Sequence, residues 1–183
     1  MRIIGGEARG RRLYIPGTFA VRPTAERIKG AFFNIIGLVD GKTFLDLFAG
    51  SGNVGIEGLS RGALKAVFVE NNRVLTDTIG RNIETCGFGG KGEILSYDFI
   101  KAIQRLVKRS EAFDILFADP PYERGIVNPT LEHLRNGYLI EKDGILAVQH
   151  SVREAAAVDE CGQVVLTDQK QYGDTILSFF RKR

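Results

Sequence analysis

Several features that would assign the chain to a special class are missing from its 183 residues. No apolar run approaches the roughly 18 residues that a membrane span requires, so no membrane partner is expected. The first residues contain no apolar stretch followed by small residues, which argues against a secretory signal and predicts a cytoplasmic protein. The sequence also has no internal repeat and no low-complexity tract, which excludes a solenoid or a compositionally biased chain.

Cysteine is scarce in the chain. Cys86 and Cys161 lie 75 positions apart and neither belongs to a C-x-x-C pair, so the sequence indicates neither a disulfide framework nor a zinc site. We expect reduced thiols and no bound metal. With 44% hydrophobic and 26% charged residues, the composition is that of an ordinary globular protein, and the length predicts a single domain over residues 1–183.

The positive charge of the chain is concentrated at its N-terminal end. Residues 1–30 contain seven Lys or Arg and two Glu, a net charge of +5, whereas residues 31–183 contain 18 basic and 20 acidic residues, a net charge of −2. A basic segment on a nearly neutral domain is typical of a protein that binds a polyanion. A solvated surface segment explains the same charge, so this pattern alone leaves both interpretations open.

The central part of the sequence alternates between short apolar runs and amphipathic stretches. The apolar runs predict strands and the stretches between them predict helices. Such alternation indicates right-handed βαβ crossovers and a parallel sheet covered on both faces. We therefore expect a doubly wound, Rossmann-like α/β fold. The expected strands are 43–48, 66–70, 93–97, 113–118 and 144–149, and the expected helices are 53–61, 73–86, 99–108 and 129–135.

The C-terminal part departs from this alternation. Residues 163–172 and 175–181 are both strand-like, and little more than Gly173 and Asp174 separates them. This pattern predicts a hairpin, so the sheet is expected to finish with an antiparallel edge.

Residues 1–40 are expected to form a small N-terminal appendage to a core of residues 41–183. Within it, residues 2–15 are expected to pair as a small β-hairpin. Thr24 can cap a helix from Ala25 to about Val39. The apolar residues of that helix recur at helical spacing and mark its buried face; they are Ile28, Phe32, Ile35 and Val39.

A glycine-rich turn follows the first strand of the core. The segment Asp46-Leu-Phe-Ala-Gly50-Ser-Gly52-Asn-Val-Gly55 runs from that strand into a helix, and glycines at such a turn let a ligand approach the backbone closely. The spacing satisfies G-x-G-x-x-G. By spacing alone, a nicotinamide or flavin dinucleotide fits as well as S-adenosylmethionine.

Acidic residues stand at the ends of the next two strands. Glu70 closes the second expected strand about 20 residues after the glycines, where a carboxylate can accept hydrogen bonds from both hydroxyls of a ribose. Asp98 follows the third strand, where a loop can meet an adenine. Asp98 also precedes an expected helix, so the alternative interpretation is a simple N-cap.

The most specific motif is Asp119-Pro120-Pro121-Tyr122, directly after the fourth expected strand. Two consecutive prolines fix a rigid turn, and Tyr122 offers a flat face beside it. Methylation of an aromatic amine requires acceptors for the amine protons and a surface that holds the ring. The Asp119 carboxylate and the Pro120 carbonyl can be those acceptors, and Tyr122 can stack on an extruded base.

These two motifs resemble those of class I S-adenosylmethionine-dependent methyltransferases that act on exocyclic amines. Three further stretches narrow the resemblance: Met1-Arg-Ile-Ile-Gly-Gly-Glu-Ala-Arg-Gly-Arg-Arg-Leu13, Arg22-Pro-Thr24 with Arg27, and Leu59-Ser-Arg-Gly62. Together they look like the RsmD-type 16S ribosomal RNA guanine-N2 methyltransferases, and the resemblance covers nearly the whole chain.

The resemblance implies a seven-stranded sheet, mostly parallel with a C-terminal antiparallel hairpin. It also implies methyl transfer from S-adenosylmethionine to a guanine N2 amine, as in 16S rRNA (guanine(966)-N2)-methyltransferases, in the small ribosomal subunit or its assembly intermediate. We expect a monomer. The residues carried over by position are Asp119, Pro120 and Tyr122 for the target amine; Asp46, Ala49, Gly50, Gly52, Glu70 and Asp98 for the cofactor; and Arg9, Arg11, Arg12, Arg22, Thr24, Arg27 and Lys29 for RNA.

The sequence departs from the family pattern at two places. Glu26, Lys29 and Gly30 differ from the usual residues after the Arg-Pro-Thr stretch, and Gln149-His150 stands where relatives often carry an acidic residue. His150 ends an expected strand near these motifs and is a further candidate for catalysis.

Other functions are compatible with parts of the sequence. An N6-adenine DNA methyltransferase uses the same Asp-Pro-Pro-Tyr chemistry but usually needs a recognition module, and a glutamine-modifying methyltransferase more often has Asn at the position of Asp119. A nicotinamide-dependent oxidoreductase explains the glycines and Glu70 but gives Tyr122 and its neighbours no role. A non-catalytic RNA-binding module explains only the basic segment.

Overall fold

The computed structural model describes residues 1–17, 24–154 and 162–183. Two compact units follow each other along the chain, Met1–Ser96 and Tyr97–Arg183. None of the helices among the described residues has the length and apolar character needed to cross a membrane. The elements in chain order are α1 (Thr24–Ile36), β1 (Thr43–Asp46), α2 (Asn53–Ser60), β2 (Lys65–Val69), α3 (Arg73–Cys86), β3 (Gly92–Leu95), α4 (Phe99–Lys108), β4 (Phe113–Ala118), α5 (Val127–Leu134), β5 (Ile140–Ser151), β6 (Val164–Tyr172) and β7 (Thr175–Lys182).

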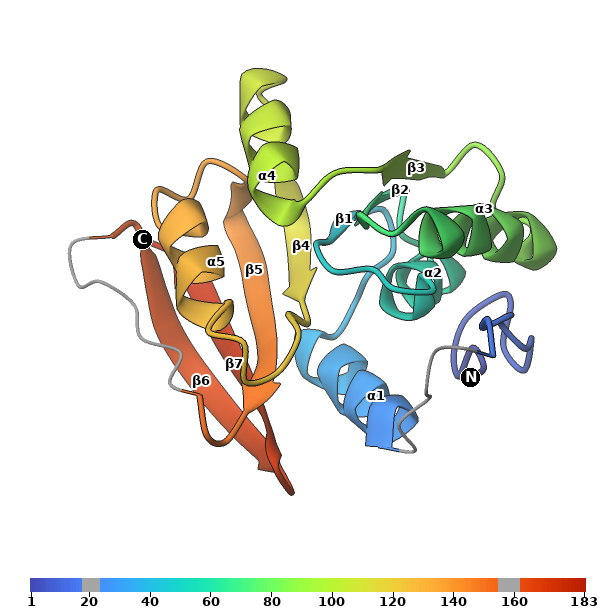
Figure 1. Cartoon of the computed structure of the whole chain (residues 1–183), viewed down its shortest axis with the longest axis horizontal. Coiled ribbons are helices and arrows are strands. Elements are labelled where there is room, and N and C mark those ends of the chain that lie inside the picture. The colour runs from blue at the N-terminus through green and yellow to red at the C-terminus, as the bar shows by residue number, and fades with distance from the viewer. Residues whose placement is uncertain (18–23, 155–161) are drawn as a thin grey trace. The chain divides into compact units, whose positions relative to one another are not determined.

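The seven strands of the described residues form one sheet in the order β3-β2-β1-β4-β5-β7-β6. Strand β2 pairs in parallel with β1 and β3, and β4 pairs in parallel with β5. Strand β7 runs antiparallel to both β5 and β6. Figure 1 shows these elements along the chain. The structure therefore confirms the expected α/β fold with a seven-stranded, mostly parallel sheet and a C-terminal hairpin.

The core of the first unit consists of the apolar strands β1 and β2 and the helix α2 that packs against them. Phe44 and Phe68 are fully buried. A Cβ atom at Gly55, in α2, would lie only 2.3 Å from the Phe68 ring. The third glycine of the G-x-G-x-x-G pattern therefore permits close packing of the helix on the strand, which is the role that the pattern predicts for it.

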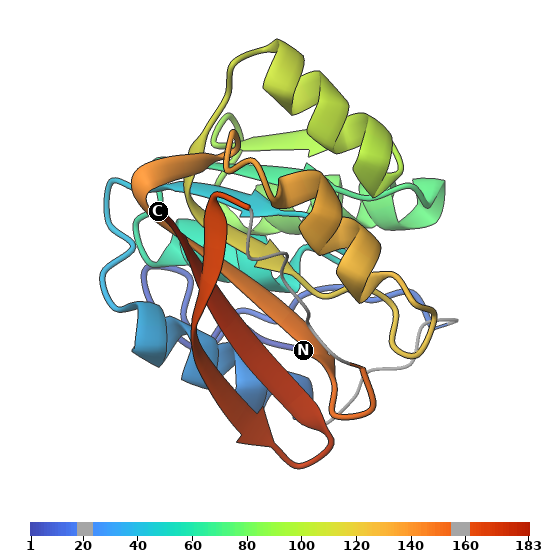
Figure 2. The same ribbon diagram turned by 90° about the vertical axis from the view of Figure 1, so that its left-hand side faces the viewer.

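The second unit is built on β4, β5 and the long hairpin of β6 and β7. Figure 2 shows this hairpin as a twisted ribbon alongside β5. Leu116, Leu146 and Phe180 are fully buried. Helices α4 and α5 pack against each other, so they belong to the same layer of this unit.

The ends of some elements differ from the expected ones. Helix α1 ends at Ile36 rather than near Val39, because Gly37 adopts a φ angle of +74° and ends the helix. Ile35, expected on the buried face, is 38% exposed, and Val39 is buried beyond the end of the helix. Strand β5 begins at Ile140 rather than at residue 144, because Ile140 already pairs with Phe113 of β4.

The N-terminal segment pairs with itself as expected for residues 2–15, but only over a short stretch. Its two arms share the isolated antiparallel bridge between Arg2 and Arg12 and backbone hydrogen bonds that join Ile3 to Gly10 and to Arg11. The middle of the segment bonds to α2 instead, where Ser60 accepts the Glu7 N–H at 2.7 Å. The Glu7 N–H is therefore satisfied by α2 and not by the opposite arm of the segment.

Candidate active site

The glycine-rich turn lies between β1 and α2, at the carboxyl end of β1. Gly50 and Gly52 have φ angles of +54° and +82°, in the left-handed region that favours glycine. The Gly52 N–H donates to the Ala49 carbonyl at 2.7 Å, and the Ala49 N–H donates to the Val69 carbonyl at 2.9 Å. The turn is therefore closed on itself and tied to the end of β2.

Two carboxylates hold this turn through its backbone. Asp46 is buried and accepts the Gly55 N–H at 2.9 Å. Glu70 is half-buried and accepts the Gly50 N–H at 3.0 Å through one oxygen and the Asn72 N–H at 2.9 Å through the other. Since each carboxylate oxygen has two acceptor positions, Glu70 can hold the turn and also accept hydroxyl groups of a ligand. The structure thus brings together the cofactor residues predicted in the first unit.

Asp98 belongs to the second unit and caps α4. One of its oxygens accepts the Lys101 backbone N–H at 2.9 Å, and the other lies 3.1 Å from the Lys101 ammonium. The hydrogen bond from the Lys101 backbone is the main reason that the pKa of Asp98 is lowered from its usual value of 3.8. The structure therefore shows the N-cap, and the contact with adenine stays a prediction.

The Asp119-Pro120-Pro121-Tyr122 motif follows β4 directly, and its polar side chains meet β5 and β7. The Gln149 side-chain amide donates to Asp119 Oδ1 at 3.0 Å and to the Tyr122 hydroxyl oxygen at 2.8 Å. The same hydroxyl lies 3.3 Å from Thr175 Oγ1. Asp119 and Tyr122 are half-buried, whereas Pro120 is buried. The motif therefore presents fixed polar groups that a substrate can reach.

Sequence reasoning noted Gln149 only as a departure from the family pattern and missed its contacts with the motif. No local pattern in the sequence indicated these contacts, although Gln149 is the half-buried member of an otherwise buried run of β5. His150 points the other way. It is 1% exposed, and its ring nitrogens lie 3.0 Å from the Ser151 carbonyl and 2.8 Å from Ser178 Oγ, which removes it from the candidate site.

The residues predicted to bind RNA are placed unevenly. Arg9, Arg11 and Arg12 are exposed on the N-terminal segment, and Arg27 is exposed on α1. Arg22 lies outside the described residues, and Thr24 is placed only as the first residue of α1.

Lys29 is a correction to the predicted RNA contacts. It is 2% exposed, so it cannot reach a phosphate on the surface. Its ammonium donates to the Arg2 carbonyl at 2.8 Å and to Asn53 Oδ1 at 2.7 Å, and lies 3.0 Å from Glu57 Oε2. Burial lowers the pKa of Lys29, although the Glu57 carboxylate acts in the opposite direction.

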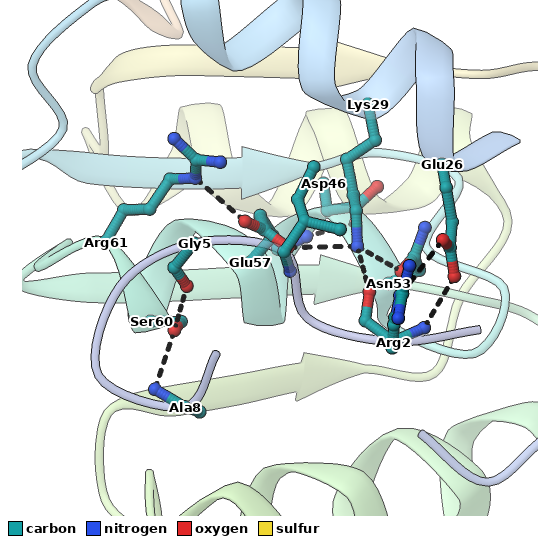
Figure 3. A network of polar contacts seen from close by, with 12 residues as sticks. Arg2, Gly5, Ala8, Glu26, Lys29, Asp46, Asn53, Glu57, Ser60 and Arg61 are labelled. Carbon is teal, nitrogen blue, oxygen red and sulfur yellow. Dashed lines mark hydrogen bonds and ion pairs between the residues drawn. The ribbon is translucent and has the colours of Figure 1, made fainter. Parts of the chain in front are cut away.

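Figure 3 shows the polar network around Glu57 that fixes the N-terminal segment to α2. Glu57 is fully buried and accepts hydrogen bonds from Arg61 Nε at 2.8 Å and from the Ile4 N–H at 2.9 Å. A Cβ atom at Gly6 would lie 1.7 Å from the Ser60 carbonyl oxygen, so only glycine permits this approach. We call Arg2, Lys29, Asn53, Glu57 and Arg61 the Lys29–Glu57 cluster.

A second buried amide joins the N-terminal segment to the glycine turn. Asn82 of α3 is 1% exposed. It donates to the carbonyls of Tyr14 and Ser51, both at 2.9 Å, and accepts the Tyr14 N–H at 2.8 Å. Lys29 makes a similar link to Asn53 at the other end of the turn. Sequence reasoning missed both links because they depend on side chains from distant segments.

The fold and the candidate site together define a class of protein. A glycine turn after β1, an acid after β2 and an antiparallel β7 inserted between β5 and β6 are the arrangement of class I methyltransferases. The family model described as "Conserved hypothetical protein 95" matches residues 1–181. The chain belongs to this family, which confirms the resemblance seen in the motifs.

Individual relatives agree with this assignment. "Putative rRNA methyltransferase YlbH" of Bacillus subtilis (strain 168) is 34% identical over 184 residues, which cover 100% of both chains. "Ribosomal RNA small subunit methyltransferase D" of Escherichia coli (strain K12) is 33% identical over 154 residues, 83% of this chain and 75% of that protein.

Solved structures share the fold over the full length of the chain. "Putative methyltransferase yhhF from Escherichia coli" has a TM-score of 0.84 and 28% identity, and the match covers 100% of this chain and 97% of that one. A hypothetical protein of Thermus thermophilus, TTHA0928, also has a TM-score of 0.84 and 28% identity, with 99% of each chain covered.

Proposed function

We propose that the protein transfers a methyl group from S-adenosylmethionine to the N2 amine of a guanine in 16S ribosomal RNA, the base that corresponds to guanine 966. Two relatives carry ribosomal RNA methylation in their names, which supports the RNA substrate. One observation supports an amine as the acceptor of the methyl group. The half-buried side chains of Asp119 and Tyr122, which follow β4, both accept hydrogen bonds from the Gln149 amide. The protein acts as a cytoplasmic monomer on the small subunit or its assembly intermediate.

The glycine turn of the first unit fits S-adenosylmethionine. Glu70 has acceptor positions left for ribose hydroxyls after it has bound two backbone N–H groups. A Cβ atom at Gly50 would meet no atom within 4 Å, so the turn presents bare backbone to a ligand. When bound, the cofactor supplies a methyl group on a positively charged sulfur. The turn and Glu70 would hold it, with Asp98 as the predicted contact of the adenine.

The second unit would hold the amine. The lone pair of a guanine N2 is delocalised into the ring, so an enzyme must fix the two amine protons before the nitrogen can attack. The Asp119 carboxylate and the Pro120 carbonyl would each accept one of these protons in a hydrogen bond, and Tyr122 would stack on the base. The nitrogen would become cationic as its bond to the methyl carbon forms and the bond from that carbon to sulfur breaks, and Asp119 would accept the proton that the nitrogen then loses.

The N-terminal segment supports an RNA substrate. Arg9, Arg11 and Arg12 are exposed. Beside them Tyr14 is 46% exposed, and the Arg81 guanidinium lies 4.2 Å from the centre of its ring. Cationic groups next to an exposed aromatic ring suit phosphates and unpaired bases of single-stranded RNA.

The test is transfer of a labelled methyl group from S-adenosylmethionine to small ribosomal subunits that lack the modification. Naked 16S rRNA and duplex DNA are assayed in parallel, and NAD binding is measured by thermal shift. We expect N2-methylguanine in the RNA of the subunits. Label on adenine in DNA would instead identify an N6-adenine DNA methyltransferase, and stabilisation by NAD without any transfer would indicate an oxidoreductase.

A further inference from the structure

Gln149 occupies a special position in the second unit. It lies on β5, and the register places it beside the end of β4, because Ala118 pairs with Val148. Asp119 is the next residue after Ala118, so the motif and Gln149 are neighbours across the two strands. This placement follows from the sheet itself and does not depend on a flexible loop.

Both protons of the Gln149 amide are committed to the motif. A side-chain amide nitrogen has two N–H donors. In this structure one donates to Asp119 Oδ1 at 3.0 Å and the other donates to the Tyr122 hydroxyl oxygen at 2.8 Å. One nitrogen atom therefore sets the distance between the carboxylate and the phenol.

The hydrogen bonds give Tyr122 a defined orientation. Its hydroxyl oxygen accepts from Gln149, so its own proton can donate to Thr175 Oγ1, 3.3 Å away on β7. Thr175 is 8% exposed and is held in the sheet by pairing with Ser151 of β5. The Tyr122 ring is thus fixed by two strands.

We propose that Gln149 is a positioning residue for methyl transfer, and this proposal rests on the function proposed above. It holds the Asp119 carboxylate and the Tyr122 ring in the geometry that the target base requires, without contact with the reacting atoms. A neutral amide suits this role, since it donates to both groups and adds no negative charge beside Asp119. Misplacement of such groups by about 1 Å is enough to slow a reaction about 100-fold.

Gln169 provides a matched control. It is also a glutamine of the same sheet, on β6, and its amide donates to Ser178 Oγ at 2.8 Å. The variants Gln149→Leu and Gln169→Leu both remove a side-chain amide from this unit. Only the first removes donors from Asp119 and Tyr122.

The experiment compares wild type, Gln149→Leu and Gln169→Leu in methyl transfer to unmodified small subunits. Affinity for S-adenosylhomocysteine and the thermal midpoint are measured on the same samples. For Gln149→Leu we expect kcat to fall about 10-fold to 100-fold, with unchanged cofactor affinity and a thermal midpoint close to that of Gln169→Leu. Gln169→Leu is expected to keep the wild-type kcat.

A second variant, Gln149→Met, tests the same inference with a side chain of similar length. Its thioether can donate neither to Asp119 nor to the Tyr122 hydroxyl oxygen, so kcat is expected to stay as low as in Gln149→Leu. Wild-type kcat in either Gln149 variant, or an equal fall in Gln169→Leu, would overturn the positioning role. Absence of transfer by the wild-type protein would overturn the proposed function and this inference with it.

Discussion

Two polar clusters of the molecule contrast in how deeply their groups are buried. In the Lys29–Glu57 cluster, both charged partners are almost fully buried, and each is bound by several groups of the protein. In the second unit, neutral groups of Gln149 and Thr175 contact Asp119 and Tyr122, which stay half-buried.

This difference in burial indicates that the two clusters have different roles. Buried charges with matched partners fix one arrangement of the chain and are costly to break. A half-buried carboxylate that is oriented but still reachable can exchange its partners for those of a substrate. The first cluster is therefore expected to control stability, and the second to control turnover. Substitutions that change stability without turnover, or turnover without stability, test this distinction.

The largest effect is expected from Asp119→Ala. Loss of the carboxylate removes an acceptor for the amine and for the proton that leaves, so kcat should fall about 100-fold to 1000-fold, as when one group that stabilises a transition state is removed. Affinity for S-adenosylhomocysteine should stay at the wild-type value, because the proposed contact is with the acceptor. Single-turnover methyl transfer and calorimetric titration measure the two quantities. Unchanged turnover would remove Asp119 from the mechanism.

Lys29→Met should show the opposite behaviour. It leaves the Glu57 carboxylate buried without its lysine, and breaking a buried pair from one side costs about 3–5 kcal/mol. Since Arg61 still pairs with Glu57 at 2.8 Å, we expect a loss at the lower end of that range, about 3 kcal/mol in the free energy of unfolding, measured with urea.

Two further variants check the cause of that loss. The double variant Lys29→Met with Glu57→Gln removes both charges and should recover much of the stability. Lys91→Met removes an exposed lysine of the same unit and should change the free energy of unfolding by less than about 0.5 kcal/mol. If Lys29→Met lowers the free energy of unfolding no more than Lys91→Met does, the cluster contributes little to the stability of the fold.

How far the sequence predicts this molecule depends on the range of the interactions concerned. Hydrophobic periodicity and capping residues act within a few positions, and they predicted the bounds of α3 and α4 as the structure gives them. The burial of Lys29 depends on Glu57 and on the Arg2 carbonyl, which come from different segments. A lysine on a basic helix gives no local sign of such partners, so the expectation of a surface contact was wrong.

The candidate site shows the same limit. The positions of Asp119 and Glu70 at strand ends followed from local pattern, and the structure places both there. The contact between Asp119 and Gln149 follows from the register of β4 on β5. Register depends on pairing between strands, so a single sequence does not reveal which polar residue of β5 faces the motif.

Glu70→Ala combines the two kinds of effect and sharpens the comparison. The carboxylate holds the glycine turn through Gly50 and Asn72 and is the proposed acceptor for the ribose. Its loss would leave the hydroxyls of a bound ribose without their acceptor, which typically costs about 1–3 kcal/mol. We expect that loss in S-adenosylhomocysteine affinity, by calorimetry, with kcat restored at saturating cofactor. Wild-type affinity would place the ribose elsewhere.

The exposed arginines of the N-terminal segment test whether this segment, which the Lys29–Glu57 cluster fixes to α2, binds RNA. Replacing Arg11 and Arg12 by Gln should reduce the slope of log affinity for RNA against log salt by up to about two contacts. Arg12 alone is expected to account for more of this change, since the Arg11 guanidinium already donates to the Thr85 carbonyl at 2.6 Å. The slope is measured by filter binding at salt concentrations between about 50 and 200 mM, because such contacts weaken over roughly this range. An unaltered slope would show that this segment does not contact RNA phosphates.

The smallest effect is expected at Asp98, where a cap and a ligand contact compete as explanations. Asp98→Ala should lower the free energy of unfolding by about 1 kcal/mol, whereas Asp98→Asn should retain most of the cap. The Lys101 backbone lowers the pKa of Asp98 from its usual value of 3.8, so the charged cap contributes fully above that pH and its contribution is lost as the pH falls through the folded-state value. If both variants bind S-adenosylhomocysteine with wild-type affinity, Asp98 acts only as the cap of α4. If both bind it more weakly, Asp98 also makes the predicted contact with adenine.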